Sequence, residues 1–270
     1  MVTQCVTPPS EPLEPLQVVK YKTIGDVELA LHIFNPPDHR ASDKKAAIVF
    51  FFGGGWNGGS PSQFFNQSKY LASRGMVSVC AEYRVKSRNQ TSPKECVMDG
   101  KSAVRWLRVH CKELGIDPNR LAAGGGSAGG HVAAATGTCK AFDEENENLK
   151  ISSRPNALVL FNPVIDNSPD GYGYSRVKEY WQDFSPMHNI DEATPPTILF
   201  LGTNDSLIPV ATVENYKKRM EEKGRRCDLH LYADQPHGFF NKAKYYETLL
   251  ETDRFLTSLG FLEGEPTLQQ

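Results

Sequence analysis

The chain has 270 residues, of which 39% are hydrophobic and 23% charged, an ordinary composition for a globular protein with a substantial core. Its 30 basic and 32 acidic residues give a formal net charge of −2 and are mixed along the chain, so nucleic acid is not an expected partner. No apolar run approaches the ~18 residues of a membrane span, and the cysteines show no metal-ligand spacing, so we expect neither membrane contact nor a metal site.

The chain begins with a Pro-rich segment, "MVTQCVTPPSEPLEPL", which has neither the basic nor the apolar region of a signal peptide. We expect residues 1–14 to form a disordered tail, residues 15–262 a single domain and residues 263–270 a second tail. The compartment stays open, because the protein could be cytoplasmic or exported with a signal already removed. The oligomeric state stays open as well.

Strands and helices alternate along the expected domain. Residues 16–24 and 27–34 are β-rich runs separated by Gly25-Asp26, a hairpin signal. Six shorter apolar runs predict further strands, at 46–52, 76–84, 120–124, 156–161, 197–202 and 227–232. Helices are expected between them, two beginning at the cap signals Ser60-Pro61-Ser62-Gln63 and Ser92-Pro93-Lys94-Glu95, and others at about 131–139, 211–223 and 241–258. In the two cap signals the serine is the expected N-cap, and Gln63 or Glu95 is expected to complete a capping box.

This alternation predicts an α/β fold, a mostly parallel central sheet with helices on both faces. One long irregular stretch, at about 164–195, interrupts the alternation. We expect it to form an insertion within the one domain.

One serine lies at the expected turn between a buried strand and a helix, in Gly125-Gly126-Ser127-Ala128-Gly129. This is the G-x-S-x-G pattern of a nucleophile elbow, in which small neighbours allow a sharp bend that exposes the hydroxyl. A Gly-rich turn kept for tight packing is one alternative. A phosphate-binding loop is another, but its G-x-x-x-x-G-K-[ST] and G-x-G-x-x-G signatures are absent. We therefore predict that Ser127 is a nucleophile.

A serine nucleophile needs a base, and the base needs an orienting acid. His237 follows the last predicted strand in the loop "ADQPHGFF" and is the expected base. Asp205, just past the strand 197–202, is the expected acid, with Asp166 as the second candidate. His131, one helical turn beyond the serine, is expected to be structural. The chain order Ser127, Asp205, His237 is the order of α/β hydrolases.

Three consecutive glycines, Gly53 to Gly55, directly follow the predicted strand 46–52. Bare glycine backbones can direct N–H groups into a site without obstructing the substrate. Two of these donors and the amide of Ala128 would form an oxyanion hole. The alternative is a flexible turn between strand and helix.

With these motifs in this order, the chain resembles α/β-hydrolase esterases of the hormone-sensitive-lipase-like and acetyl-xylan and feruloyl esterase-like branch. The resemblance runs from about residue 15 to 260 and rests on "FGGGW" for the family's HGGGW, "GGSAGGH", "GTNDSLIP" and "HGFF". It implies an α/β-hydrolase fold with a short insertion over the active site and no cofactor. It also implies a triad of Ser127, Asp205 and His237 and an oxyanion hole formed by Gly54, Gly55 and Ala128.

Two residues depart from the family pattern. Phe52 replaces the histidine whose hydrogen bonds help to hold the glycine loop, so we expect a different loop anchor. Gly126 replaces the aspartate that lipase-like members often carry, which favours the carbohydrate-esterase side. The chain also lacks the long N-terminal cap of lipase-like members, so we expect an open site with little provision for long acyl chains.

Aromatic residues gather next to the expected oxyanion loop and in the insertion. Trp56 is expected to form a wall of the substrate pocket, and the insertion carries Tyr172, Tyr174 and Trp181. These side chains could stack against sugar rings or aryl groups. They could equally pack the insertion against the domain.

The resemblance and the motifs together predict a serine carboxylic-ester hydrolase. We expect a small-molecule or carbohydrate ester as substrate, with a short acyl chain and in particular an acetyl group, as in acetylxylan. A peptidase of the prolyl-oligopeptidase kind and a non-catalytic binding protein on a hydrolase fold are the alternatives. The peptidase typically has a gating domain and an aromatic residue after the nucleophile, where this chain has Ala128.

Overall fold

The computed structural model describes residues 14–268. The tail expected at residues 1–14 lies outside the described residues except for Glu14, and so do the last two residues of the segment 263–270.

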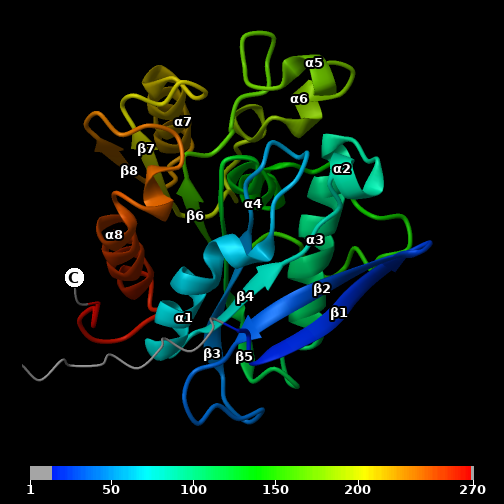
Figure 1. Cartoon of the computed structure of the whole chain (residues 1–270), viewed down its shortest axis with the longest axis vertical. Helices are drawn as coiled ribbons and strands as arrows, with labels where there is room; N and C mark the ends of the chain where they lie inside the picture. The colour runs from blue at the N-terminus through cyan, green and yellow to red at the C-terminus, as the bar shows by residue number, and fades with distance from the viewer. Residues whose placement is uncertain (1–13, 269–270) are drawn as a thin grey trace, which may run out of the picture.

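Eight strands form one sheet in the order β1-β2-β4-β3-β5-β6-β7-β8 (Figure 1). β1 (Gln17–Ile24) and β2 (Val27–Phe34) form the predicted hairpin, and β2 also pairs antiparallel with β4. The other neighbours pair in parallel, which confirms the predicted mostly parallel sheet. These strands are β3 (Lys45–Phe51), β4 (Val77–Ala81), β5 (Ile116–Gly126), β6 (Ala157–Phe161), β7 (Thr197–Gly202) and β8 (Cys227–Tyr232).

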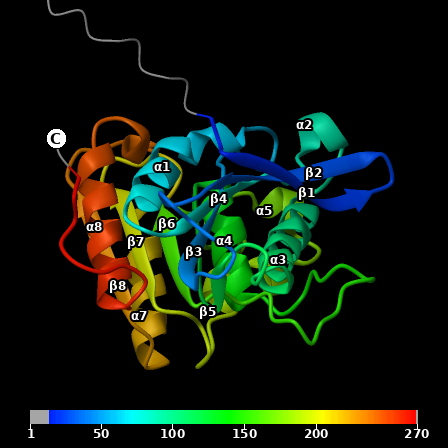
Figure 2. The same cartoon turned by 90° about the horizontal axis from the view of Figure 1, so that it is seen from below.

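Helices cover both faces of the sheet (Figure 2). α1 (Phe65–Ser73) and α8 (Tyr245–Ser258) pack on one face, and α3 (Pro93–Val109), α4 (Ala128–Thr138) and α7 (Val210–Glu222) pack on the other. Successive residues of β3 contribute in turn to the two cores, as the alternation of side chains along a strand requires. A central strand of a doubly covered sheet must therefore be apolar throughout, which explains the run "AAIVFFF".

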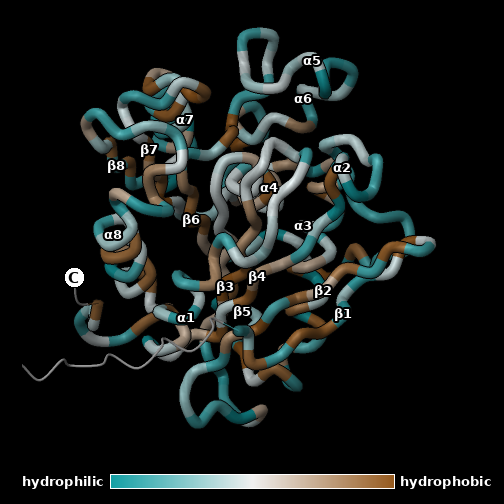
Figure 3. The backbone as a smooth tube through the Cα atoms, viewed as in Figure 1, coloured by the Kyte–Doolittle hydropathy of each residue, from teal (hydrophilic) through white to brown (hydrophobic). Residues whose placement is uncertain are grey.

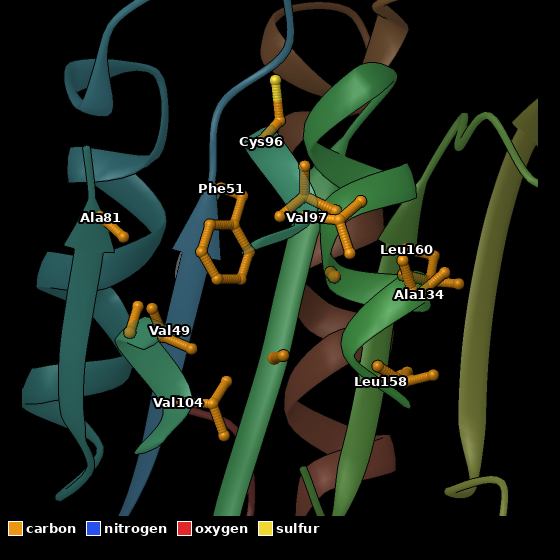
Figure 4. Close-up of a cluster of buried hydrophobic side chains, with 14 of the residues drawn as sticks. Val49, Phe51, Ala81, Cys96, Val97, Val104, Ala134, Leu158 and Leu160 are labelled. Carbon is orange, nitrogen blue, oxygen red and sulfur yellow. The ribbon is translucent and has the colours of Figure 1, made fainter. Parts of the chain in front are cut away.

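Hydrophobic residues concentrate in the central strands, whereas many connecting loops are polar (Figure 3). Figure 4 shows the larger core, where Phe51 of β3 lies next to Val97 of α3 and Ala134 of α4 lies next to Leu160 of β6. All four of these side chains are fully buried. The alanine-rich sequence of α4 allows this helix to lie close to the sheet beneath the serine.

Short elements that the sequence did not predict lie at the ends of the strands. The insertion contains α5 (Tyr174–Val177), α6 (Trp181–Phe184) and a 3-10 turn at Pro186–His188, and α2 (Lys86–Asn89) follows β4. Single turns of helix carry no repeating apolar pattern, so periodicity cannot detect them. Further 3-10 turns, at Pro61–Phe64 and Phe239–Asn241, precede α1 and α8.

β5 begins four residues earlier than the predicted strand 120–124. It starts at Ile116, which pairs with Lys45, and the register then shifts so that Leu121 pairs with Ala47. The intervening Asp117-Pro118-Asn119 are turn-forming residues, and they mask the beginning of this irregular strand.

The two predicted cap signals have different outcomes. Ser92 and Glu95 form the expected capping box, with the Ser92 N–H donating to Glu95 Oε2 at 2.9 Å. Ser60 Oγ accepts from the Ser62 N–H at 3.3 Å, so the N-cap is present. The prediction that Gln63 completes a capping box is wrong, because its side chain turns to the glycine loop after β3.

No helix within residues 14–268 combines the length and the apolar character that crossing a lipid bilayer would require. The parallel strands all end at the same edge of the sheet, where α/β proteins place their sites. The expected nucleophile, acid, base and glycine loop follow β5, β7, β8 and β3, so the topology gathers them at this edge.

Candidate active site

Ser127 lies on a strained bend between β5 and α4, with φ 54° and ψ −119°. A Cβ on Gly125 would lie 2.4 Å from Gly129 O, and a Cβ on Gly129 would lie 2.1 Å from Phe51 O. Neither position can hold a side chain without displacing backbone. The Ser127 N–H donates to Phe161 O at 3.0 Å, which fixes the bend against β6. Backbone strain of this kind costs about 1–3 kcal/mol and is concentrated at functional sites.

Gly126 is required for a different reason. A Cβ at this position would lie 2.5 Å from Cζ of Phe240, whose ring fills the space. Phe240 belongs to the "HGFF" segment and stacks on Phe161 and Phe64. The departure from the lipase-like pattern is therefore explained by packing beneath the base loop.

Ser127, His237 and Asp205 form a continuous hydrogen-bonded chain. His237 Nε2 lies 2.9 Å from Ser127 Oγ, and His237 Nδ1 lies 2.7 Å from Asp205 Oδ2. The Asp205 side chain is fully buried, and its Oδ1 accepts from the N–H groups of Leu207 and Ile208 at 2.8 and 3.0 Å. A carboxylate only accepts hydrogen bonds, so the imidazole proton lies on Nδ1 and the lone pair of Nε2 faces the serine.

The second acid candidate does not reach this chain. Asp166 Oδ1 accepts from the Ser168 N–H at 2.8 Å and lies 3.9 Å from His188 Nδ1. His188 also lies 2.9 Å from Ser185 Oγ. Burial lowers the pKa of His188, and the nearby Asp166 opposes this shift.

His131 is completely buried beneath the site. Its Nε2 lies 3.0 Å from Phe184 O, and its ring contacts those of Phe184 and Trp56. Burial lowers the pKa of His131 from 6.5 to about 3. A neutral imidazole that ties α4 to the insertion agrees with the expected structural role.

The glycine loop after β3 presents free N–H groups next to the serine. The Gly53 N–H donates to Gln63 Oε1 at 2.6 Å and is therefore occupied. Among the described residues, no acceptor is recorded for the N–H groups of Gly54, Gly55 and Ala128. Gly54 and Gly55 have φ values of 134° and 62°, which L side chains rarely adopt.

Phe52 anchors the glycine loop by stacking. Its ring lies 4.1 Å from the ring of Tyr83 at an interplanar angle of 15°, and Tyr83 Oη donates to Phe52 O at 2.5 Å. Both side chains are buried, and burial raises the pKa of the Tyr83 phenol well above its usual value. The anchor expected from a histidine is thus supplied by an aromatic pair.

Two arginines donate to carbonyls of the same loop from opposite ends. Arg88 of α2 donates to Gly59 O at 2.8 Å, and Arg176 of α5 donates to Gly55 O at 2.6 Å. Gly55 O belongs to the peptide directly after the Gly55 N–H, so the Arg176 bond restrains the loop next to that donor. Sequence reasoning missed both arginines, because nothing local marks a side chain that reaches a distant carbonyl.

The aromatic residues of the expected pocket have different surroundings. Trp56 is 2% exposed and packs among Tyr172, His131 and Phe184, with the Arg176 guanidinium 4.7 Å from its ring. Its main contacts therefore hold the insertion against the domain.

Within the insertion, the aromatic side chain of Tyr172 reaches the glycine loop. Its hydroxyl would lie 3.3 Å from a Cβ on Gly55. Trp181 packs against His188, at 5.1 Å between ring centroids, and Tyr174 is a partly buried residue at the start of α5. The structure thus brings Tyr172 to the glycine loop and gives Trp181 a contact within the insertion.

Sequence reasoning also missed Asn162, the first residue after β6. It is fully buried, its Nδ2 lies 3.2 Å from His237 Nε2, and its Oδ1 accepts from the Gly238 N–H at 3.1 Å. A polar residue directly after a buried strand, at the edge that carries the other site residues, was the available signal.

Two family profiles match the chain, BD-FAE over residues 31–170 and the dienelactone hydrolase family over residues 172–262. Among solved structures, the apo form of Thermogutta terrifontis esterase 2 is 42% identical, with a TM-score of 0.89 over 95% of this chain and 98% of that one. The same esterase has been solved phosphorylated by paraoxon (43% identity, TM-score 0.87, 92% and 96% covered) and with butyrate bound (40%, 0.89, 94% and 98%).

Curated relatives are more distant. A probable carboxylic ester hydrolase, LipM of Mycobacterium tuberculosis, is 25% identical over 92% of this chain and 64% of its own length. An acetylxylan esterase of Xylanibacter ruminicola is 28% identical over 69% of this chain and 40% of its own length. The chain thus spans about two fifths to two thirds of the length of these two relatives.

Proposed function

Because this chain belongs to the BD-FAE family of α/β-hydrolase esterases, we propose that it hydrolyses carboxylic esters through an acyl-enzyme on Ser127. The observation that carries the proposal is the hydrogen-bonded chain from Asp205 through His237 to Ser127. Within residues 14–268, the N–H groups of Gly54 and Gly55 in the glycine loop and of Ala128 at the start of α4 have no recorded acceptor, so they are free to donate to an oxyanion.

In the acylation step, His237 takes the proton of Ser127 as Oγ attacks the ester carbonyl carbon. The carbonyl oxygen becomes an oxyanion and accepts from the N–H groups of Gly54, Gly55 and Ala128. His237 then gives its proton to the leaving alcohol, and the C–O bond to the alcohol breaks. Asp205 stays ionised and stabilises the imidazolium.

In the deacylation step, a water molecule takes the place of the alcohol. His237 removes a proton from this water, whose oxygen attacks the acyl carbon of the ester on Ser127. The same N–H groups hold the second oxyanion. The proton returns through Nε2 to Ser127 Oγ, and the carboxylic acid leaves.

We propose short acyl esters, in particular acetyl groups on a carbohydrate, as the substrate class. The acetylxylan esterase among the relatives supports this choice, as does the butyrate-bound esterase 2. The insertion that reaches the glycine loop through Arg176 is short, and its helices α5 and α6 are single turns. Hydrolysis of p-nitrophenyl esters should accordingly decline from C2 to C12, and acetylated xylan should release acetate.

Replacing Ser127 with alanine tests the nucleophile. We expect kcat for p-nitrophenyl acetate to fall by about 10⁴-fold or more, because the attacking oxygen is removed. A fluorophosphonate probe should label the wild type and leave Ser127→Ala unlabelled. Ser73→Ala, at an exposed serine of α1, is the matched control and should behave as the wild type.

Near-normal turnover by Ser127→Ala would refute the proposal. Faster cleavage of prolyl amides than of matched esters would favour a peptidase instead. A folded wild type that neither turns over esters nor takes up the probe would favour a binding protein on this fold.

A further inference from the structure

Asn162 is held in an unusual conformation against the base loop. It is fully buried and has φ 33°, a left-handed backbone conformation that an L side chain adopts at a cost. Its own N–H donates to Phe200 O at 2.7 Å, which fixes the backbone to β7. The strain and the burial together place one amide group against His237.

The orientation of this amide is determined by its other contact. The Gly238 N–H is a donor, so the Asn162 atom 3.1 Å from it must be the oxygen. The NH2 group therefore faces His237 Nε2 at 3.2 Å. The amide both ties down the residue after the base and donates to the nitrogen that must receive the proton.

Every polar contact of the His237 ring follows from these positions. Nδ1 faces the carboxylate of Asp205, and Nε2 faces the hydroxyl of Ser127 and the amide of Asn162. Within the described residues, Asp205 is the one charged group recorded within hydrogen-bond distance of the ring. The lone pair of Nε2 thus faces two donors, the Ser127 hydroxyl and the Asn162 NH2. The hydroxyl loses its proton when the serine is acylated.

We propose that Asn162 is a positioning residue that acts through His237, keeping the Nε2 lone pair of the neutral ring directed at the reacting atoms. This inference rests on the proposed function. Once Ser127 Oγ carries the acyl group it has no proton to donate, and the Asn162 NH2 remains as the donor at Nε2. The ring therefore keeps its orientation until water enters and deacylation begins.

An isosteric substitution separates this role from a purely structural one. Asn162→Asp keeps an oxygen to accept from the Gly238 N–H, so the loop contact is preserved. It replaces the NH2 with a carboxylate oxygen, which favours a proton on Nε2. The variant should therefore need a higher pH to expose the lone pair, whereas a loop-tethering role predicts an unchanged profile.

The experiment compares pH profiles of kcat/KM for p-nitrophenyl acetate and of fluorophosphonate labelling. In Asn162→Asp the acid limb of both profiles should move up by about 1–3 pH units, as expected for a carboxylate placed next to an imidazole. KM should stay within about twofold, because Asn162 does not contact the substrate in this mechanism. Asn167→Asp is the matched control: Asn167 is also fully buried, but it donates to Tyr172 O and should leave the limb in place.

Asn162→Ser covers the case in which the aspartate variant does not fold. This smaller change removes the NH2 group, and the serine hydroxyl is one bond shorter than the amide, so it is withdrawn from Nε2. We expect kcat to fall by roughly 10-fold or more with KM little changed, since an unanchored ring loses its alignment. Profiles of Asn162→Asp that superimpose on the wild type, or an Asn162→Ser variant with unchanged kcat, would overturn the inference. Labelling of Ser127→Ala would instead refute the proposed function, so the two failures are distinguishable.

Discussion

At the scale of single residues, the bend at Ser127 depends on three neighbouring glycines, because a side chain at any of them would collide with surrounding atoms. A side chain at Gly125 or Gly129 would collide with backbone atoms, whereas a side chain at Gly126 would collide with the Phe240 ring. The first two follow from the geometry of any strand–turn–helix elbow and could be predicted from the pattern. The third depends on a ring more than a hundred residues away, and no local pattern predicts such a contact.

A methyl group at position 126 tests this packing. In Gly126→Ala the Phe240 ring must shift, and overpacking of this kind lowers the free energy of unfolding by about 1–3 kcal/mol. Gly58→Ala is the matched control, because a Cβ there meets nothing closer than 3.7 Å and the φ of Gly58 is ordinary. Urea denaturation measures both variants. Equal stability of the two would contradict the packing argument.

At the scale of elements, the glycine loop is held in place by side chains from neighbouring elements. Gln63 and Tyr83 fix its beginning, while Arg88 and Arg176 reach it from α2 and α5. Gln63 illustrates the limit of sequence reasoning here. Its position after a serine and a proline is that of a capping residue, yet a longer-range partner, the Gly53 N–H, takes its side chain. A local capping signal therefore fails to predict the contact when the same side-chain atom is bound by a residue of the site.

Arg176 couples the insertion to this loop, which leads to a kinetic prediction. In Arg176→Gln the bond to Gly55 O is lost and the loop peptides are less well oriented, so kcat should fall roughly tenfold, the effect of about one charged hydrogen bond. KM for p-nitrophenyl acetate should change little. Lys178→Gln, an exposed cation on the same insertion, is the control. A large rise in KM at constant kcat would indicate that Arg176 binds substrate instead.

At the scale of the whole molecule, the strongly patterned parts of the chain are the predictable ones. The eight strands, the hairpin and the long helices follow from apolar runs and turn residues, because burial on two faces dictates composition. The irregular start of β5 and the short helices of the insertion do not, because tertiary contacts determine them. The edge hairpin is a further example: Lys22 of β1 and Arg84 after β4 both donate to the buried carboxylate of Asp99 in α3, and no sequence pattern announces this link.

The buried His131 makes global stability depend on pH. Its pKa is about 3 in the folded protein and about 6.5 when exposed, so below 6.5 the unfolded chain binds a proton that the folded chain does not. His131 therefore destabilises the protein as the pH falls from about 6.5 towards 3, by roughly 1.4 kcal/mol per pH unit. In His131→Asn this contribution is absent.

Urea denaturation at pH 7 and pH 4.5 measures the effect. The wild type should lose about 2–3 kcal/mol more than His131→Asn between these two conditions, since two pH units lie below the unfolded value. Parallel losses in the two proteins would show that the buried imidazole does not carry this dependence.

The Arg176 guanidinium, which links the insertion to Gly55 O, also limits how the sequence of the insertion can change. A segment over a site is normally free to vary, and its variation tunes which molecules are accepted. Here the same segment supplies Arg176 to the glycine loop that we propose holds the oxyanion. Exchanging the insertion, residues 164–195, for that of a relative should therefore alter kcat as well as substrate preference.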